Sequence, residues 1–260
     1  MTVIPIDLSA ARILVSNDDG IEAPGIKVLE RIAAALSDDV WVVAPETEQS
    51  GTGHSLTLRR PLRVRAVEER RYAVDGTPTD CVLLAINEIL KARRPTLVLS
   101  GVNRGGNLGE DVTYSGTVAA AMEGTILGVP SIALSQEYPV GGKVPWATAE
   151  TLAPDLIRRL CAIGWPRNTL VNVNFPAVAP DQVTGVRACT QGRRKIGDQI
   201  VVGEDPRGAP YHWIGSMRTE DPTVAGTDLN AVHAGAVAVT PIDMNMTDHP
   251  TLTKFAETFH

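Results

Sequence analysis

Short apolar runs alternate with amphipathic segments along most of the chain. Between the runs, apolar residues recur at helical spacing, as at Ile26, Leu29 and Ile32, and predict helices near 24–36, after Thr77, over 118–127 and near 147–163. Alternating strands and helices are typical of a doubly wound α/β sheet in which most strands are parallel. The runs that predict strands are residues 13–15, 40–43, 72–74, 97–99, 131–134, 170–173 and 236–239.

The alternation weakens after residue 176. Turn residues such as Gly203 and Gly208 separate short alternating runs, which predict β-hairpins or an arm outside the main sheet. We therefore expect a single domain over 1–260, with an α/β core over 11–176 that carries the site. The extension over 177–260 would hold the hairpin arm and a returning strand. Such a hairpin permits exchange with a neighbouring subunit.

Composition and charge limit the kinds of partner and site that the protein is expected to have. Of the 260 residues, 43 % are hydrophobic and 21 % charged, as in a soluble globular protein, and the net charge is −6. This charge argues against a nucleic-acid polymer or an anionic membrane as partner. The three cysteines, Cys81, Cys161 and Cys189, are odd in number and widely spaced, which argues against a disulfide scaffold or a zinc site. With no signal peptide or membrane-spanning run in the sequence, we expect a cytoplasmic protein.

Polar oxygen-bearing residues follow three of the predicted strands. Asp18 and Asp19 follow the first strand, and further along the chain come Ser50 and Asn103. Ligands of open α/β sheets bind at the carboxyl ends of the strands. An oxygen-only set suits a hard cation such as Mg²⁺ or Mn²⁺. Taken singly, each residue has a structural alternative, since Asp, Asn and Ser commonly form turns and caps.

A second candidate feature is the start of the alanine-rich helix. Ser115, Gly116 and Thr117 leave the first backbone N–H groups of that helix open to an anion such as a phosphate. The alternative is an ordinary serine cap. His54, in the loop after the second strand, could donate to a phosphate or a leaving group, and is equally consistent with a surface histidine.

Several nucleotide and hydrolase motifs are absent from the sequence. The glycine-rich stretch 101–109 is neither G-x-G-x-x-G nor a P-loop. Glu48 stands where a G-x-S-x-G elbow around Ser50 would need glycine. These absences argue against a dinucleotide-binding protein, a P-loop NTPase and an α/β-hydrolase.

Taken together, the motifs closely resemble the SurE family, the stationary-phase survival proteins with 5′-nucleotidase activity. The similarity runs in order from Ile13 to about Pro241, nearly the whole chain. Its motifs are residues 13–21 (ILVSNDDGI), 43–45 (VAP), Ser50 with 53–55 (GHS), 76–81 (GTPTDC), 100–107 (SGVNRGGN), 114–117 (YSGT), 172–176 (NVNFP) and 239–241 (VTP).

The resemblance implies a Rossmann-like three-layer core and a metal-dependent phosphomonoesterase that acts on nucleoside 5′-monophosphates. It extends the expected substrates to 3′-nucleotides and short polyphosphate, and implies a homodimer or homotetramer with an exchanged C-terminal segment, here within 190–225. The implied metal ligands are Asp18, Asp19, Ser50 and Asn103. The implied phosphate-binding residues are Asn107, Ser115, Gly116 and Thr117.

We therefore expect hydrolysis at one divalent cation per subunit, Mg²⁺ or Mn²⁺, which activates a water. Asp18 or Asp19 would help to deprotonate that water, and an aspartyl-phosphate intermediate is the other route. The alternative function is a nucleotide-binding regulatory module with a structural divalent ion. A flavin or nicotinamide enzyme is disfavoured by the missing glycine fingerprint.

Overall fold

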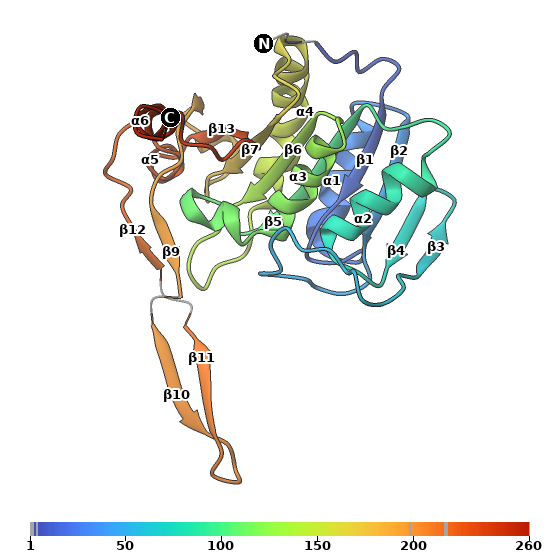
Figure 1. Cartoon of the computed structure of the whole chain (residues 1–260). Helices are drawn as coiled ribbons and strands as arrows, with labels where there is room; N and C mark the ends of the chain where they lie inside the picture. The colour runs from blue at the N-terminus through green and yellow to red at the C-terminus, as the bar shows by residue number, and fades with distance from the viewer. Residues whose placement is uncertain (1–2, 4, 198, 216–217, 260) are drawn as a thin grey trace.

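The computed structural model (Figure 1) describes residues 3, 5–197, 199–215 and 218–259. Among these residues, one sheet of nine strands has the order β3-β4-β2-β1-β5-β6-β7-β13-β8. Its six strands from β4 to β7 run parallel, while β3 and β13 are antiparallel to their inner neighbours. The strands are β1 (Arg12–Ser16), β2 (Asp39–Pro45), β3 (Val64–Glu68), β4 (Arg71–Val74), β5 (Leu97–Arg104), β6 (Ser131–Gln136), β7 (Thr169–Phe175), β8 (Val186–Ala188) and β13 (Val237–Asp243).

Helices cover both faces of this sheet (Figure 1). Helices α1 (Pro24–Ala34) and α4 (Trp146–Ile163) pack Ile26, Leu29 and Ile157 into one apolar cluster with the sheet. On the opposite face lie α2 (Pro78–Leu84), which continues as the short helix η1 (Ala85–Ile89), and α3 (Gly116–Ile126). The predicted α/β class and its three layers are confirmed.

Strand register brings the polar strand ends together. Val15 of β1 lies opposite Val42 of β2 on one side and Leu99 of β5 on the other. Because these strands are parallel, the chain leaves all three of them at the same edge of the sheet. At this edge, the segment 17–23 therefore meets the loop after β2 and the C-terminal end of β5.

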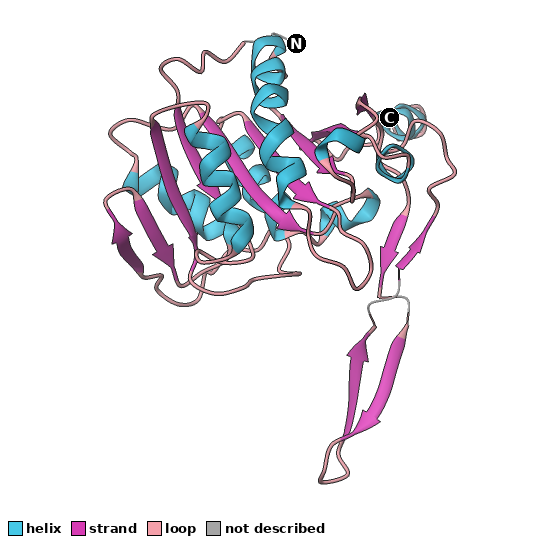
Figure 2. Cartoon of the chain, turned by 180° about the vertical axis from the view of Figure 1, so that it is seen from behind, coloured by secondary structure: helices cyan, strands magenta, loops and turns pink. Residues whose placement is uncertain are grey.

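The C-terminal part both extends the sheet and leaves it. The expected returning strand is present as β13, and it pairs antiparallel with β7. Strand β8 pairs with β13, so the expectation that the hairpins after residue 176 lie outside the main sheet is wrong at this strand. The described residues within 194–220, called the arm below, form two two-stranded sheets that project from the core (Figures 1 and 2). The boundary at residue 176 stays a prediction. The arm's strands are β9 (Arg194–Ile196), β10 (Ile200–Glu204), β11 (Pro210–Ile214) and β12 (Arg218–Glu220).

Three further helices are short: η2 (Gly109–Thr113) and η3 (Pro180–Gln182) are 3-10 helices, and α5 (Asp228–His233) lies beside β13. The last helix, α6 (His249–Ala256), has only exposed residues. No helix in the described ranges combines the length and apolar character that a bilayer crossing requires.

Candidate active site

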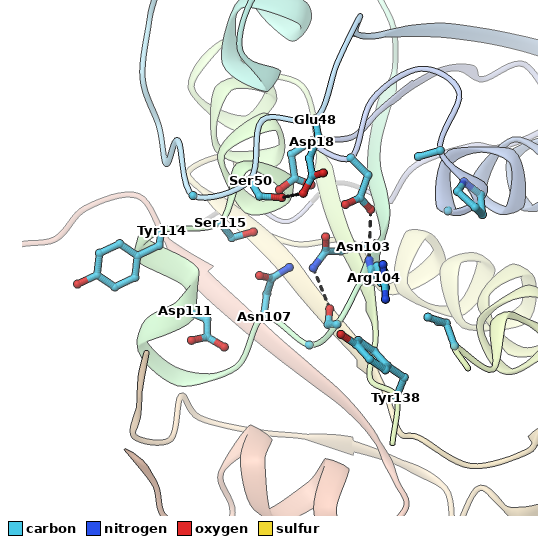
Figure 3. Close-up of a pocket in the computed structure, with 18 of the residues that line it drawn as sticks. Asp18, Glu48, Ser50, Asn103, Arg104, Asn107, Asp111, Tyr114, Ser115 and Tyr138 are labelled. Atoms are coloured by element: carbon cyan, nitrogen blue, oxygen red, sulfur yellow. Dashed lines mark hydrogen bonds between the residues drawn. The ribbon is translucent and has the colours of Figure 1, made fainter. Parts of the chain in front are cut away.

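A cavity of about 1300 Å³ opens at the carboxyl ends of β1, β2 and β5 (Figure 3). Six of the nine residues predicted for the site line it, and they come from five separate segments of the chain. These residues are Asp18, Asp19, Ser50, Asn103, Asn107 and Ser115. The position follows from the parallel register, because the loops that leave neighbouring parallel strands share one edge.

Asp18 is a buried carboxylate at this edge, with 4 % of its surface exposed. Burial raises its pKa to about 6, and the hydrogen bond from the Thr117 hydroxyl to Asp18 Oδ1 opposes that rise. The negative charge of Asp19 adds a smaller upward contribution to the same pKa. Asp18 is therefore a carboxylate whose charged form an adjacent cation would favour.

Asp19 is half-buried beside it. The backbone N–H of Arg104 donates to Asp19 Oδ2 over 3.3 Å. Burial raises the pKa of Asp19, the Arg104 N–H lowers it, and the charge of Glu48 raises it further. The two aspartates are held by different elements, Asp18 by α3 and Asp19 by the end of β5.

The loop after β2 brings Ser50 and a third carboxylate, Glu48, to the cavity (Figure 3). The Ser50 hydroxyl donates to Glu48 Oε1 over 2.9 Å. The sequence reasoning missed Glu48 as a site residue and used it only to exclude an elbow motif. Its place two residues before Ser50, in the loop that follows a buried parallel strand, is the signal that could have found it.

Asn103 and Asn107 are fixed by hydrogen bonds that leave one of their groups for the cavity. Asn103 Nδ2 donates to the backbone oxygen of Gly105 over 2.8 Å, and Figure 3 shows the amide oxygen on the side facing Asp18 and Ser50. The backbone N–H of Asn107 donates to Asn174 Oδ1, and its carbonyl accepts from Asn172 Nδ2, each over 2.8 Å. Asn172 and Asn174 alternate along β7 and are fully buried, a polar pattern that the sequence showed without revealing its role.

At the start of α3, Gly116 and Thr117 lie against Asp18, and Ser115 lines the cavity. Ser115 Oγ caps the helix by accepting from the Val118 N–H over 3.1 Å, yet Ser115 also lines the cavity. Gly116 permits close approach, since a Cβ there would lie 2.7 Å from Asp18 Cβ. Thr117 is fully buried and gives its hydroxyl to Asp18. Gly116 and Thr117 are not among the lining residues, so the predicted contact of the Thr117 hydroxyl with phosphate differs from what the structure shows.

His54 does not join the other predicted site residues. Its Nε2 lies 2.9 Å from Glu123 Oε2, and the residue is not part of the cavity lining. Glu123 is a buried carboxylate on α3, 6 % exposed, and a buried acid needs a hydrogen-bond partner. The structure thus gives His54 a structural partner.

The base of the arm also lines the cavity, through Lys195, Gly197, Ile200 and Ile214. Next to it, Arg194 is 3 % exposed, with Asp111 at 3.3 Å, Glu137 at 3.3 Å and Glu220 at 3.2 Å. Asp111 lines the cavity, and burial raises its pKa to about 6 although Arg194 acts in the opposite direction. None of these arm contacts was predicted, because the sequence does not show onto which loop a projecting hairpin folds.

Within the described residues, no three His, Cys, Asp or Glu side chains are placed so that they could together hold a metal ion. A cation at this edge would therefore be held by a mixed set of two carboxylates with neutral oxygens from Ser50 and Asn103. Such a set is of the kind that hard divalent cations bind.

Comparisons with known proteins identify the family of this chain. The sequence matches the family described as Survival protein SurE over residues 13–198. The 5′-nucleotidase SurE of Paramagnetospirillum magneticum is 65 % identical over 248 residues, covering 95 % of both chains. The protein of the same name from Rhodospirillum rubrum is 59 % identical over 249 residues, with the same coverage.

A solved structure gives the same result for the fold. The crystal structure of the SurE protein from Aquifex aeolicus superposes with a TM-score of 0.83 at 39 % identity, covering 95 % of this chain and 99 % of that one. The sequence matches and the fold comparison thus agree, and the chain belongs to the SurE family.

Proposed function

We propose that this chain is a 5′-nucleotidase, a metal-dependent phosphomonoesterase that converts nucleoside 5′-monophosphates to nucleoside and phosphate. Two relatives at 65 % and 59 % identity carry the name 5′-nucleotidase SurE, which supports this activity. The observation that carries the proposal is the convergence of Asp18, Asp19 and Asn103 on one cavity that also contains Ser115. We extend the proposed substrates to 3′-nucleotides and short polyphosphate.

The residues fit one divalent cation, Mg²⁺ or Mn²⁺. Asn103 uses its amide nitrogen on Gly105, which leaves its amide oxygen available. Ser50 donates its proton to Glu48, which leaves its oxygen lone pairs available. Asp18 is buried, and the hydrogen bonds that lower its pKa come from backbone groups and a hydroxyl, so a cation would balance its charge. When bound, such an ion supplies Lewis acidity that draws charge from the phosphoryl group and acidifies water.

The chain's own groups then bind the substrate and move the proton. Asn107 and Ser115, which line the cavity, would hold the phosphate oxygens as their charge redistributes. The oxygen of the attacking water would form a new bond to phosphorus while Asp18 or Asp19 accepts its proton. The bond from phosphorus to the 5′ oxygen breaks, and that oxygen takes up a proton from solvent to leave as the nucleoside hydroxyl. Thr117 keeps Asp18 in place through its hydroxyl.

The test measures phosphate release from AMP, GMP and an aryl phosphate by the purified full chain, with Mg²⁺ or Mn²⁺ and with excess chelator. We expect turnover with either ion, its loss in chelator, and a fall of at least about 100-fold for Asp19→Ala, in line with the loss of a cation ligand. Unchanged turnover in chelator or in Asp19→Ala would refute the proposal. Nucleotide-dependent thermal stabilisation without phosphate release would favour the regulatory module instead.

We also propose that the chain forms a homodimer or homotetramer in the cytoplasm, with an exchanged C-terminal segment. The exposed apolar residues of the arm support the assembly, and the three buried, unpaired cysteines fit a reducing compartment. Nucleotides are the proposed substrates, and neither a nucleic-acid polymer nor a membrane is a proposed partner.

A further inference from the structure

Glu48 lies beside the proposed cation ligands without completing a carboxylate site. It lines the same cavity as Asp18 and Asp19. In the described part of the chain, however, no three acidic, His or Cys side chains are placed to bind a metal together. Glu48 contacts one of the proposed cation ligands, Ser50, whose hydroxyl donates a hydrogen bond to Glu48 Oε1 over 2.9 Å.

The direction of this hydrogen bond decides what Ser50 can offer. A serine hydroxyl has one proton to donate and two lone pairs. Because the proton points to Glu48, the lone pairs remain free for a cation. A hydroxyl without this acceptor could turn its proton toward the cavity, where a cation would repel it. An anionic acceptor also makes the hydroxyl oxygen a stronger donor of electron density.

The loop that carries both residues is fixed against the first strand. The backbone N–H of Gln49, between them, donates to the carbonyl of Asp18 over 2.8 Å. Gly20 adopts a φ of +101°, and a Cβ there would lie 3.3 Å from the carbonyl carbon of Thr47, so the two loops touch through a glycine. Glu48 and Ser50 are thus held in register with the aspartates.

We propose that Glu48 is a positioning residue of the cation site, which accepts the Ser50 proton so that the Ser50 oxygen faces the ion. This inference rests on the proposed function, because it assumes that the cavity binds a divalent cation. Glu48 thus affects the affinity for the cation by orienting the Ser50 hydroxyl.

Mn²⁺ binding to the purified full chain, followed by electron paramagnetic resonance of the free ion and by calorimetry, tests the inference. We expect Glu48→Ala to weaken Mn²⁺ binding by about 10-fold to 100-fold, the usual effect of losing a group that orients a ligand. Glu48→Gln keeps an acceptor oxygen and should lose less. In a Ser50→Ala background, Glu48→Ala should change affinity by less than about twofold, because its effect passes through the missing hydroxyl.

The matched control is Glu46→Ala. Glu46 lies on the same loop, pairs with Arg65 and is outside the cavity lining, so its removal should leave Mn²⁺ affinity unchanged. Thermal unfolding of each variant shows that it is folded.

Three results would overturn the inference while leaving the proposed function intact. They are unchanged Mn²⁺ affinity in Glu48→Ala, an equal loss in Glu48→Gln and Glu48→Ala, and an equal effect of Glu48→Ala with or without Ser50. The last two would assign the effect to charge alone. If the unmodified chain bound no Mn²⁺ and its turnover resisted chelator, the proposed function itself would fail.

Discussion

Two buried carboxyl groups face the cavity under different constraints. Asp18 takes hydrogen bonds from Thr117, whereas Asp111 has the Arg194 guanidinium within 3.3 Å but neither of its oxygens has a hydrogen-bond partner. Burial raises the pKa of both groups to about 6. Such carboxylates cost folding free energy when charged, and this cost is typical of sites that bind or transform a ligand.

At the residue scale, we predict that Asp111 makes the unfolding free energy depend on pH, and that Asp111→Asn removes this contribution. The pKa of Asp111 rises from 3.8 to about 6 on folding, so between these values the folded protein keeps a proton that the unfolded chain has lost. The resulting stabilisation is complete below about pH 4 and is lost as the pH rises through about 6. Asparagine does not titrate, so the unfolding free energy of Asp111→Asn relative to the unmodified chain should rise by on the order of 3 kcal/mol from pH 4 to pH 7.

Urea unfolding at a series of pH values measures this difference. The control is Asp181→Asn, at an exposed position, which should run parallel to the unmodified chain throughout. Parallel curves for Asp111→Asn as well would contradict the prediction.

At the scale of elements, the base of the arm is tied to the loop that carries the predicted phosphate-binding residues. Asp228, fully buried at the start of α5, accepts from the Gly109 N–H over 2.9 Å and from the Gly192 N–H over 2.8 Å. The Arg194 N–H donates to Glu110 Oε2 over 2.5 Å. The short helix η2, between Asn107 and Ser115, is thus held from the arm side, and the arm base takes part in shaping the cavity.

We predict that Arg194→Ala lowers the unfolding free energy by about 3 to 5 kcal/mol, because it removes the cation beside the buried carboxylate of Asp111. Since η2 would also lose an anchor, KM for AMP should rise more than kcat falls. Chemical unfolding and steady-state kinetics measure the two effects. Arg207→Ala, at the exposed tip of the arm, is the matched control and should change neither quantity. An equal response of the two variants would disprove the role of Arg194.

At the scale of the whole molecule, the arm exposes apolar side chains that the described chain does not cover. Val202, Trp213 and Ile214 are 65 %, 66 % and 75 % exposed. An isolated two-stranded ribbon is only marginally stable in water, and exposed apolar patches mark interaction surfaces. The last helix, α6, adds Phe255 at 56 % exposure. The predicted exchange of a C-terminal segment between subunits would cover such surfaces.

We therefore predict that the chain sediments as a dimer or tetramer, and that Trp213→Ser shifts it toward smaller species. Removing a large aromatic ring from an interface typically costs at least about 2 kcal/mol of association free energy, enough to change the dissociation constant roughly 30-fold. Sedimentation at several protein concentrations measures the shift. Asn87→Ala, an exposed change outside both the arm and the C-terminal extension, serves as control. A monomer at all concentrations would contradict the predicted assembly.

The sequence by itself determined the α/β class, the family and the candidates at the strand ends. Runs such as residues 13–15 are apolar throughout because both faces of a central parallel strand are buried. The helix predicted after Thr77 is present as α2, and it begins with a capping box of Thr77 and Asp80, which is local chemistry. The class and the SurE resemblance are confirmed, while the roles of the site residues stay predictions.

Only the tertiary structure decided how the polar groups are used. Thr117 lies 99 positions from Asp18, and its hydroxyl binds that carboxylate instead of facing the cavity. His54 contacts the buried Glu123. Glu48 reaches the cavity on a loop that packs closely against Gly20. The physical reason is that local patterns report burial and backbone preference, which act within a few residues. The choice of a hydrogen-bond partner depends on which distant groups packing brings within about 3 Å, and no local pattern contains that information.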